Sequence, residues 1–155
     1  MKNKDAMKIN GFFRVQITED GKGVIGDSGW KENQVTNLGI QDYLVDWLIG
    51  DTDNGKSITH LALGSGSQPA SNGTSLEGEV AKRQAVTTSI ISSRTAQFTG
   101  QFASDNSFIA GSSDISNVGL FNTSAAGTIF AGNTYASSSC ATNQNVNVTY
   151  QIRFS

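Results

Sequence analysis

Apolar and polar residues alternate most regularly at the end of the sequence, over residues 146–154. Every second residue there is apolar, and the residues between are Asn, Thr, Gln and Arg. Such alternation predicts a β-strand with one face in the core and the other in water. Two shorter apolar runs, residues 117–122 and 127–135, come just before it and are separated by turn residues. We therefore expect the last forty residues to form a β unit on which the rest of the chain is organised.

A similar alternation occurs near the start, over residues 11–18, and a turn rich in Gly, Asp and Glu follows at residues 19–23. Val24 and Ile25 come directly after this turn, so the segment is predicted to form a β-hairpin. Residues 30–35 are expected to be extended and to lead into a helix.

One segment has the spacing of an amphipathic helix, with apolar residues at i, i+4, i+7 and i+8 between a capping residue and a glycine. The cap is Thr36 or Asn37, the apolar face is Ile40, Leu44, Trp47 and Leu48, and the C-terminal glycine is Gly50. We expect this face to pack on a sheet.

Four further stretches are predicted to be strands, at residues 57–64, 84–92, 96–102 and 107–110. The fold class is therefore expected to be mainly β: an antiparallel β-sandwich, jelly-roll-like, with one short α-helix packed on it. Residues 1–9 are expected to form an N-terminal arm and residues 10–155 a single β-sandwich domain.

The composition of the chain limits the classes of function that we expect. A chain of 155 residues can bury a core without metal or disulfide support. The net charge is −2 and the basic residues are scattered, so no nucleic-acid surface is expected. Cys140 is the single cysteine and excludes an intrachain disulfide. No apolar run has the length of a signal or membrane segment, so we expect a soluble protein made in a cytosol.

Charge is nearly absent from residues 95–152, where Asp105 and Asp114 are the only charged side chains. Sheet edges are usually protected by charge, so uncharged strands favour a domain that packs beside another subunit. The alternative is a monomer with a polar surface, whose edges are protected by bulges or by short strands.

Residues 50–57, with the sequence GDTDNGKS, match the phosphate-loop pattern G-x-x-x-x-G-K-[ST]. A phosphate loop follows a strand and begins a helix, whereas here a predicted helix precedes and a predicted strand follows. Asp51 and Asp53 would also repel phosphate. We interpret the segment as a helix-to-strand connection.

The start of the same loop resembles a calcium-binding loop, because Asp51, Asp53 and Gly55 are suitably spaced. Lys56 and Ala62 stand where such a loop has its glycine and its bidentate glutamate. A weak Ca²⁺ site at Asp51 and Asp53 and a simple solvated turn both stay open.

Other candidate chemistry is sparse. His60 and Cys140 together provide too few ligands for a zinc site, and no G-x-S-x-G elbow occurs, so His60 is expected in the core or at an interface. Glu77 and Glu79 have the form of a glycosidase pair but lack an aromatic cleft, so we expect solvated loop residues.

Aromatic residues offer one contact candidate. Tyr43 and Trp47 are expected to pack in the helix and Tyr150 in the last strand. Trp30, beside Gly29 in a predicted loop, is the candidate for an exposed contact.

Six short segments resemble small structural proteins encoded by tailed bacteriophages. They are NQVTNLGI at 33–40, ITHLALGSG at 58–66, LEGE at 76–79, NVGLFN at 117–122, GTIFA at 127–131 and YQIRF at 150–154. Asn117 stands where that family usually has an acidic residue. The resemblance implies a virion component of β-sandwich type, assembled in symmetric copies on the head, neck or tail.

We therefore expect a non-enzymatic virion structural protein with no catalytic residue, cofactor or metal. The first hypothesis is a capsid decoration or cement protein acting through multivalent protein–protein contacts. The alternative is a tail-fibre, collar or spike domain that binds a host receptor or glycan. Expected partners are major capsid, neck or tail proteins and further copies of the chain, a homotrimer being one form. Neither nucleic acid nor a membrane is an expected partner, and the expected location is the virion, assembled in the host cytoplasm.

Overall fold

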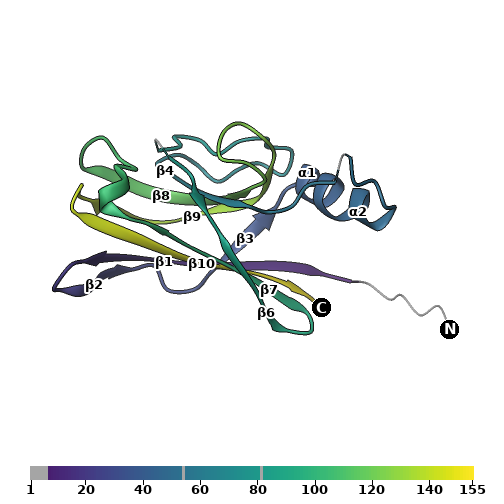
Figure 1. Ribbon diagram of the computed structural model, residues 1–155, viewed down its shortest axis with the longest axis horizontal. Coiled ribbons are helices and arrows are strands. Elements are labelled where there is room, and N and C mark those ends of the chain that lie inside the picture. Colours follow the sequence, from purple (N-terminus) through teal and green to yellow (C-terminus); the bar gives the residue numbers. More distant parts are fainter. Residues whose placement is uncertain (1–6, 54, 81) are drawn as a thin grey trace.

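The computed structural model describes residues 7–53, 55–80 and 82–155, and antiparallel β-strands make up most of this part of the chain (Figure 1). The strands are β1 (Ile9–Glu19), β2 (Gly23–Asp27), β3 (Lys31–Val35), β4 (His60–Gly64), β5 (Gln84–Ala85), β6 (Thr87–Ser92), β7 (Thr95–Phe102), β8 (Ser113–Phe121), β9 (Ile129–Cys140) and β10 (Gln144–Phe154). The helical elements are α1 (Asn37–Ile40), the π-helical η1 (Gln41–Val45), α2 (Asp46–Leu48) and the 3-10 turn η2 (Ser104–Asn106).

The first and last strands form the longest pairing in the described sheet. β1 pairs with β10 along its whole length, from Ile9 opposite Phe154 to Glu19 opposite Gln144. β7 adds to the other side of β10, and β2 and β3 add to β1. The predicted hairpin and the predicted final strand are thus confirmed.

The chain changes its pairing partner at two places, and these changes bend the sheet round. The first part of β3 pairs with β1, and its last two residues pair with β9. On the other side, β5 pairs with β4 and β6 pairs with β7, with only Val86 between them. The strands therefore form one antiparallel sheet that is nearly closed into a barrel. A mainly β fold with one short helical segment is confirmed, whereas the sandwich or jelly-roll form is not.

The core fills the inside of this sheet. On β10 the residues Val146, Val148, Tyr150 and Ile152 are buried, as their alternation predicts. Phe13 on β1 stacks on Tyr150 at 5.8 Å between ring centroids and meets Tyr135 on β9 edge-on at 6.0 Å. These contacts join the two sides of the barrel through aromatic packing.

At the N-terminus, strand β1 begins at Ile9, and Lys8 exchanges two backbone hydrogen bonds with Ser155. The expected arm covers residues 1–9, of which residues 1–6 lie outside the described part.

The strand predicted at residues 107–110 is wrong. The turn η2 precedes it, and Ser107 has a left-handed backbone with φ of 50°, which reverses the chain. Phe108 and Ile109 are nonetheless buried, and Phe108 packs against Phe102. Their apolar character indicated burial correctly, but a turn delivers them to the core.

The helix forms where expected, and its ends match the prediction. Thr36 is the N-cap: its hydroxyl accepts a hydrogen bond from the Gly39 backbone at 2.9 Å and also lies 2.8 Å from the Ile129 carbonyl, to which it donates. Gly50, with φ of 77°, ends the helical segment.

The predicted apolar face of the helix is wrong. Of the four predicted residues, only Leu44 packs against the core. Gly39, Asp42 and Tyr43 are buried, whereas Ile40, Trp47 and Leu48 are exposed. Two features explain this. A β-carbon on Gly39 would lie 2.1 Å from the Phe130 carbonyl oxygen, so the face with Gly39 is the one that approaches β9. The π-helical turn η1 then breaks the 3.6-residue period on which the prediction depends.

Gly39→Ala should lower the stability of the protein, although replacing glycine by alanine in a helix usually raises it. In an ordinary helix, alanine is about 1 kcal/mol better than glycine. Here the added methyl group meets backbone atoms of Phe130 that cannot rotate away. We expect a loss of about 1–3 kcal/mol in the free energy of unfolding, measured by urea denaturation. Gly111→Ala is the control, because the space around Gly111 is open; equal stability of the two variants would contradict the close approach.

Candidate functional site

The helical segment and the residue that follows it expose more large apolar side chains than any other part of the described chain. Its exposed apolar residues are Ile40, Val45, Trp47, Leu48 and Ile49. Leu48 is 85% exposed and Ile49 is 72% exposed, which is far from the burial expected of core residues. Contiguous apolar patches on soluble proteins commonly mark contact surfaces. We call these five residues the helix patch.

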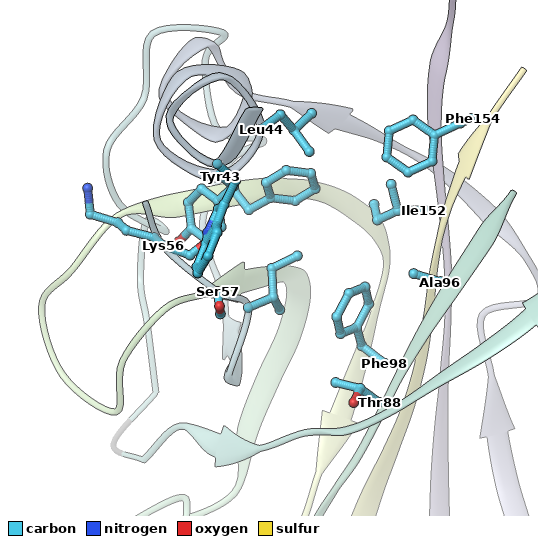
Figure 2. Close-up of a pocket in the computed structure, with 12 residues that line it drawn as sticks. Tyr43, Leu44, Lys56, Ser57, Thr88, Ala96, Phe98, Ile152 and Phe154 are labelled. Carbon is cyan, nitrogen blue, oxygen red and sulfur yellow. The ribbon is translucent and has the colours of Figure 1, made fainter. Parts of the chain in front are cut away.

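An apolar groove lies between the helix and the end of the sheet (Figure 2). It measures about 400 Å³, within the range of small binding sites. Its main apolar lining residues are Tyr43, Leu44, Trp47, Phe98, Ile152 and Phe154. In Figure 2 Leu44 lies on the helix side and Phe98, Ile152 and Phe154 on the strand side. The groove is thus a part of the apolar interior that the helix does not cover.

The phosphate-loop-like segment fastens the helix side of this groove. The Lys56 amine lies 2.5 Å from the Asp42 carboxylate, and the Lys56 carbonyl accepts a hydrogen bond from the Trp47 indole at 3.0 Å. The helix precedes and β4 follows, in the order that the sequence predicts. Lys56 is therefore engaged with Asp42, and the segment acts as a strap across the helix.

Burial and the nearby negative charge of Asp42 raise the pKa of Tyr43 well above its usual value. Its hydroxyl donates a hydrogen bond to the Thr128 carbonyl, and its ring packs edge-on against Phe130 at 5.1 Å. The phenol therefore stays neutral and anchors the helix to β9.

The two candidate calcium ligands lie in the loop after the helix. Asp51 accepts a hydrogen bond from the Asp53 backbone at 3.2 Å. Within the described part of the chain, no three His, Cys, Asp or Glu residues gather in a way that could hold a metal ion.

A second exposed apolar feature is strand β6. All six of its residues are exposed, and Ile90 is 84% exposed. β6 pairs with β7 on one side and ends the strand order of the described sheet, so its other edge faces solvent. Unpaired strand edges are templates for another strand.

His60 lies at the start of β4, half-buried, with its Nδ1 atom 2.8 Å from the Thr59 hydroxyl. Burial, and to a lesser extent the charge of Arg83, lower the pKa of His60. The neutral imidazole is thus favoured over the charged one. Its expected place in the core or at an interface fits this partial burial.

Arg83 is a residue whose importance the sequence does not indicate. Its side chain is only 5% exposed and lies over the Phe121 ring at 3.5 Å. It donates to both carboxylate oxygens of Glu79, at 2.6 and 3.0 Å, and to the carbonyls of Thr123 and Ala126 at 2.9 and 2.6 Å. One guanidinium thus joins two loops.

The two loop glutamates, Glu77 and Glu79, bind different partners. Glu79 pairs with Arg83, whereas Glu77 accepts a hydrogen bond from the Ser67 backbone at 2.9 Å. That bond lowers the pKa of Glu77. The buried Asn117 amide donates to the carbonyls of Ser67 and Glu77 at 3.2 and 2.9 Å, which an acidic residue at that position could not do. Both glutamates serve to fix the loop at residues 65–80.

Arg83→Met should destabilise the fold, because Glu79 and two loop carbonyls lose a charged donor while the apolar stem is kept. The expected loss is about 2–3 kcal/mol in the free energy of unfolding, measured by urea denaturation. Arg94→Met, at an exposed arginine, is the matched control. Similar small losses for both variants would show that the Arg83 network carries no stability.

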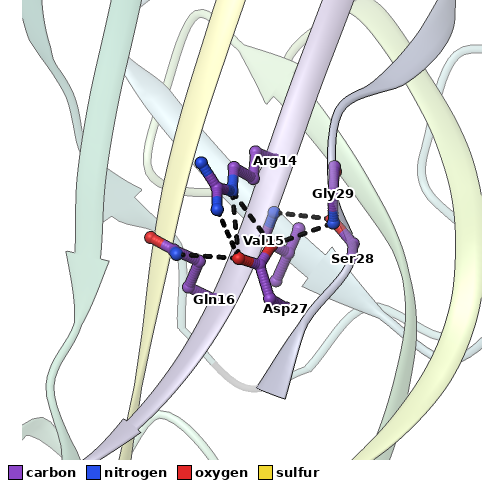
Figure 3. Close-up of polar contacts among 6 residues, drawn as sticks. All are labelled: Arg14, Val15, Gln16, Asp27, Ser28 and Gly29. Atoms are coloured by element: carbon purple, nitrogen blue, oxygen red, sulfur yellow. Dashed lines mark hydrogen bonds and ion pairs between the residues drawn. The ribbon is translucent and has the colours of Figure 1, made fainter. Parts of the chain in front are cut away.

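A polar cluster on the outer face of β1 joins that strand to the end of β2 (Figure 3). The Arg14 guanidinium contacts both oxygens of the Asp27 carboxylate, with Nε at 2.9 Å from Oδ1. The Gln16 amide and the Gly29 backbone also donate to Asp27. The hydrogen bond from Arg14, followed by the one from Gly29, lowers the pKa of Asp27 well below its usual value.

This shift predicts a pH dependence. Because the pKa of Asp27 is lower in the folded state than in the unfolded state, its contribution is present above the ordinary carboxyl pKa of about 4. It is lost as the pH falls through the folded-state pKa. The difference in Tm between the wild type and Asp27→Asn should therefore be largest near pH 7 and shrink from pH 5 towards pH 2. Asp114→Asn, at an exposed carboxylate, is the control; a difference that does not vary with pH would contradict the assignment.

Trp30 is exposed, as the sequence predicts. It lines a shallow hollow with Phe12, Gln151 and Arg153, and the Arg153 guanidinium lies 5.6 Å from the Phe12 ring centre. By contrast Trp47, expected to be packed, is 44% exposed, so that prediction is wrong.

Comparisons of the chain with protein-family models, curated proteins and solved structures found no match. Among the described residues no helix is long and apolar enough to span a membrane. The main surface features of the described chain are the helix patch, the groove and the β6 edge. Sequence reasoning missed these surfaces; the adjacent apolar pairs Leu48–Ile49 and Ile90–Ile91 are the only signal that could have indicated two of them.

Proposed function

We propose that this chain is a non-enzymatic structural protein of a tailed-bacteriophage virion, most directly a capsid decoration or cement protein. The observation that carries the proposal is the helix patch, which exposes five large apolar side chains on one short helical segment. A protein part that works by adhesion needs such a surface, because burying apolar area is the main source of its binding free energy.

Two further features support a role in assembly. The described residues 95–152 expose few charges, so long-range repulsion between neighbouring copies is small. The Arg83 and Asn117 contacts fix the long loop at residues 65–80, and a rigid surface loses less entropy on binding. Many copies with moderate contacts then give durable attachment.

The proposal includes a two-layer, sandwich-type arrangement that is jelly-roll-like. The layer of β1, β10 and β7 would face the layer of β4, β8 and β9, and the Phe13–Tyr135 contact between β1 and β9 supports it. The proposed partners are major capsid, neck or tail proteins and other copies of the chain, and the proposed location is the virion.

The test uses purified particles of the phage whose genome encodes the chain. We expect the protein in those particles at a copy number set by capsid symmetry, measured by quantitative mass spectrometry and by a density map at ~4 Å. A double variant Leu48→Lys, Ile49→Lys should reduce particle occupancy about tenfold, which corresponds to ~1.4 kcal/mol of binding. Val24→Lys, at an exposed residue of β2, is the control. Particles that lack the protein would contradict the proposal.

A tail-fibre, collar or spike domain is the second candidate. The hollow formed by Trp30, Phe12 and Arg153 favours it, because an exposed aromatic beside polar groups suits a sugar ring. The same density map decides between the two, since a place at the tail tip would favour this candidate over a shell protein.

A further inference from the structure

We propose that the free edge of β6 is the surface through which two copies of this chain pair, as antiparallel strands about a two-fold axis. The inference deepens the proposed function, since it rests on the self-association included there and names the surface that would serve it.

The pairing of β6 with β7 shows on which face of the sheet the β6 side chains lie. Thr88 lies opposite Phe98, and Phe98 lies opposite the buried Tyr150. Ile90 lies opposite Ala96, and Ala96 opposite the buried Ile152. Opposite residues in antiparallel strands share a face of the sheet. Thr88 and Ile90 therefore lie on the inner, apolar face, yet both are exposed.

The apolar groove reaches this same face of β6 and β7. Thr88, Ala96 and Phe98 line the groove in Figure 2, so the uncovered inner face runs from the groove to the β6 edge. A strand added beside β6 would extend this face and bring its own inward side chains over it. It would also pair the backbone groups on the outer edge of β6. A β-strand therefore suits this edge better than a helix or a small molecule.

The strand that suits this edge is β6 of a second copy. Residues 84–93 carry no charge, and the regular part of β6, residues 87–90, precedes its bulge. With Ser89 on the two-fold axis, Thr88 lies opposite Ile90 of the partner copy. The pairing makes two cross-strand contacts between β-branched residues on the inner face and places no like charges opposite each other. The edge is thus complementary to itself.

Strand β2, another edge of the described sheet, differs from β6 in this respect. β2 carries Asp27, and its hairpin holds the Glu19–Lys22 and Arg14–Asp27 ion pairs. Charge of this kind protects strand edges from pairing. Of these two edges, β6 is the one that no charge protects.

The first experiment measures oligomeric state by size-exclusion chromatography with light scattering. We expect the mass of two chains for the wild type and of one chain for Ile90→Lys, because a charge on the inner face of an edge strand prevents pairing. Ile25→Lys, on β2, is the matched control and should stay a dimer. Since Ile90 is 84% exposed, Tm should change little in the variant, which separates lost pairing from unfolding.

The second experiment fixes the register. Directly opposed Cα atoms in antiparallel strands are about 4.5–5.5 Å apart, within the range of a disulfide. Ser89→Cys should therefore form a disulfide-linked dimer on mild oxidation. Ser124→Cys, in an exposed loop, should not, and neither should the wild type, whose Cys140 is buried.

The outcomes separate the two proposals. A trimer, or a dimer that Ile90→Lys leaves intact, would overturn β6 pairing while self-association within the virion proposal stands. A wild type that stays a single chain at high concentration would overturn both β6 pairing and self-association. A wild-type single chain that captures a different protein on β6 would also overturn the pairing of two copies.

Discussion

The pairing of β1 with β10 is the constraint on which the rest of the structure depends. It joins the two ends of the chain over eleven paired positions, from Ile9 to Glu19, and sets the inner face of the sheet. Phe13 stacks on Tyr150 across this pair, and β2, β3 and β7 build on it. Because the pairing needs residues from both ends, its contacts are non-local, and we expect folding to be slow relative to helical proteins of this size.

The exposed surfaces follow from how this sheet closes. The partner changes at β3 and between β5 and β6 bring the sheet round into a near-barrel. The helix fits against β9 through Gly39 and Tyr43, which leaves its other face outside. Residues of β6 and β7 line the groove across from the helix (Figure 2), and Ile90 of β6 is exposed.

The sequence predicted those features that depend on residues close together in the chain. Alternation predicted β1 and β10, turn residues predicted the first hairpin, and Thr36 and Gly50 predicted the ends of the helix. The rest depends on distant partners. The packed face of the helix is set by the approach of Gly39 to Phe130, far along the chain, and by a π-helical turn without a clear sequence signature. Besides Glu79, Arg83 binds the carbonyls of Thr123 and Ala126, and no spacing in the sequence reveals those two distant partners. The groove and the β6 edge result from closure of the whole sheet, so sequence reasoning could indicate apolar residues there but not their exposure.

We infer that the chain is a β-barrel-like part whose open edge at β6 is completed by contact with a second copy. Amide hydrogen exchange, followed residue by residue at low and high protein concentration, tests it most directly. We predict strong protection of β1 and β10 at both concentrations. Amides on the outer edge of β6 should exchange quickly when the protein is dilute and slowly when it is concentrated. Fast exchange of the β6 edge at every concentration, or weak protection of β1 and β10, would contradict the account.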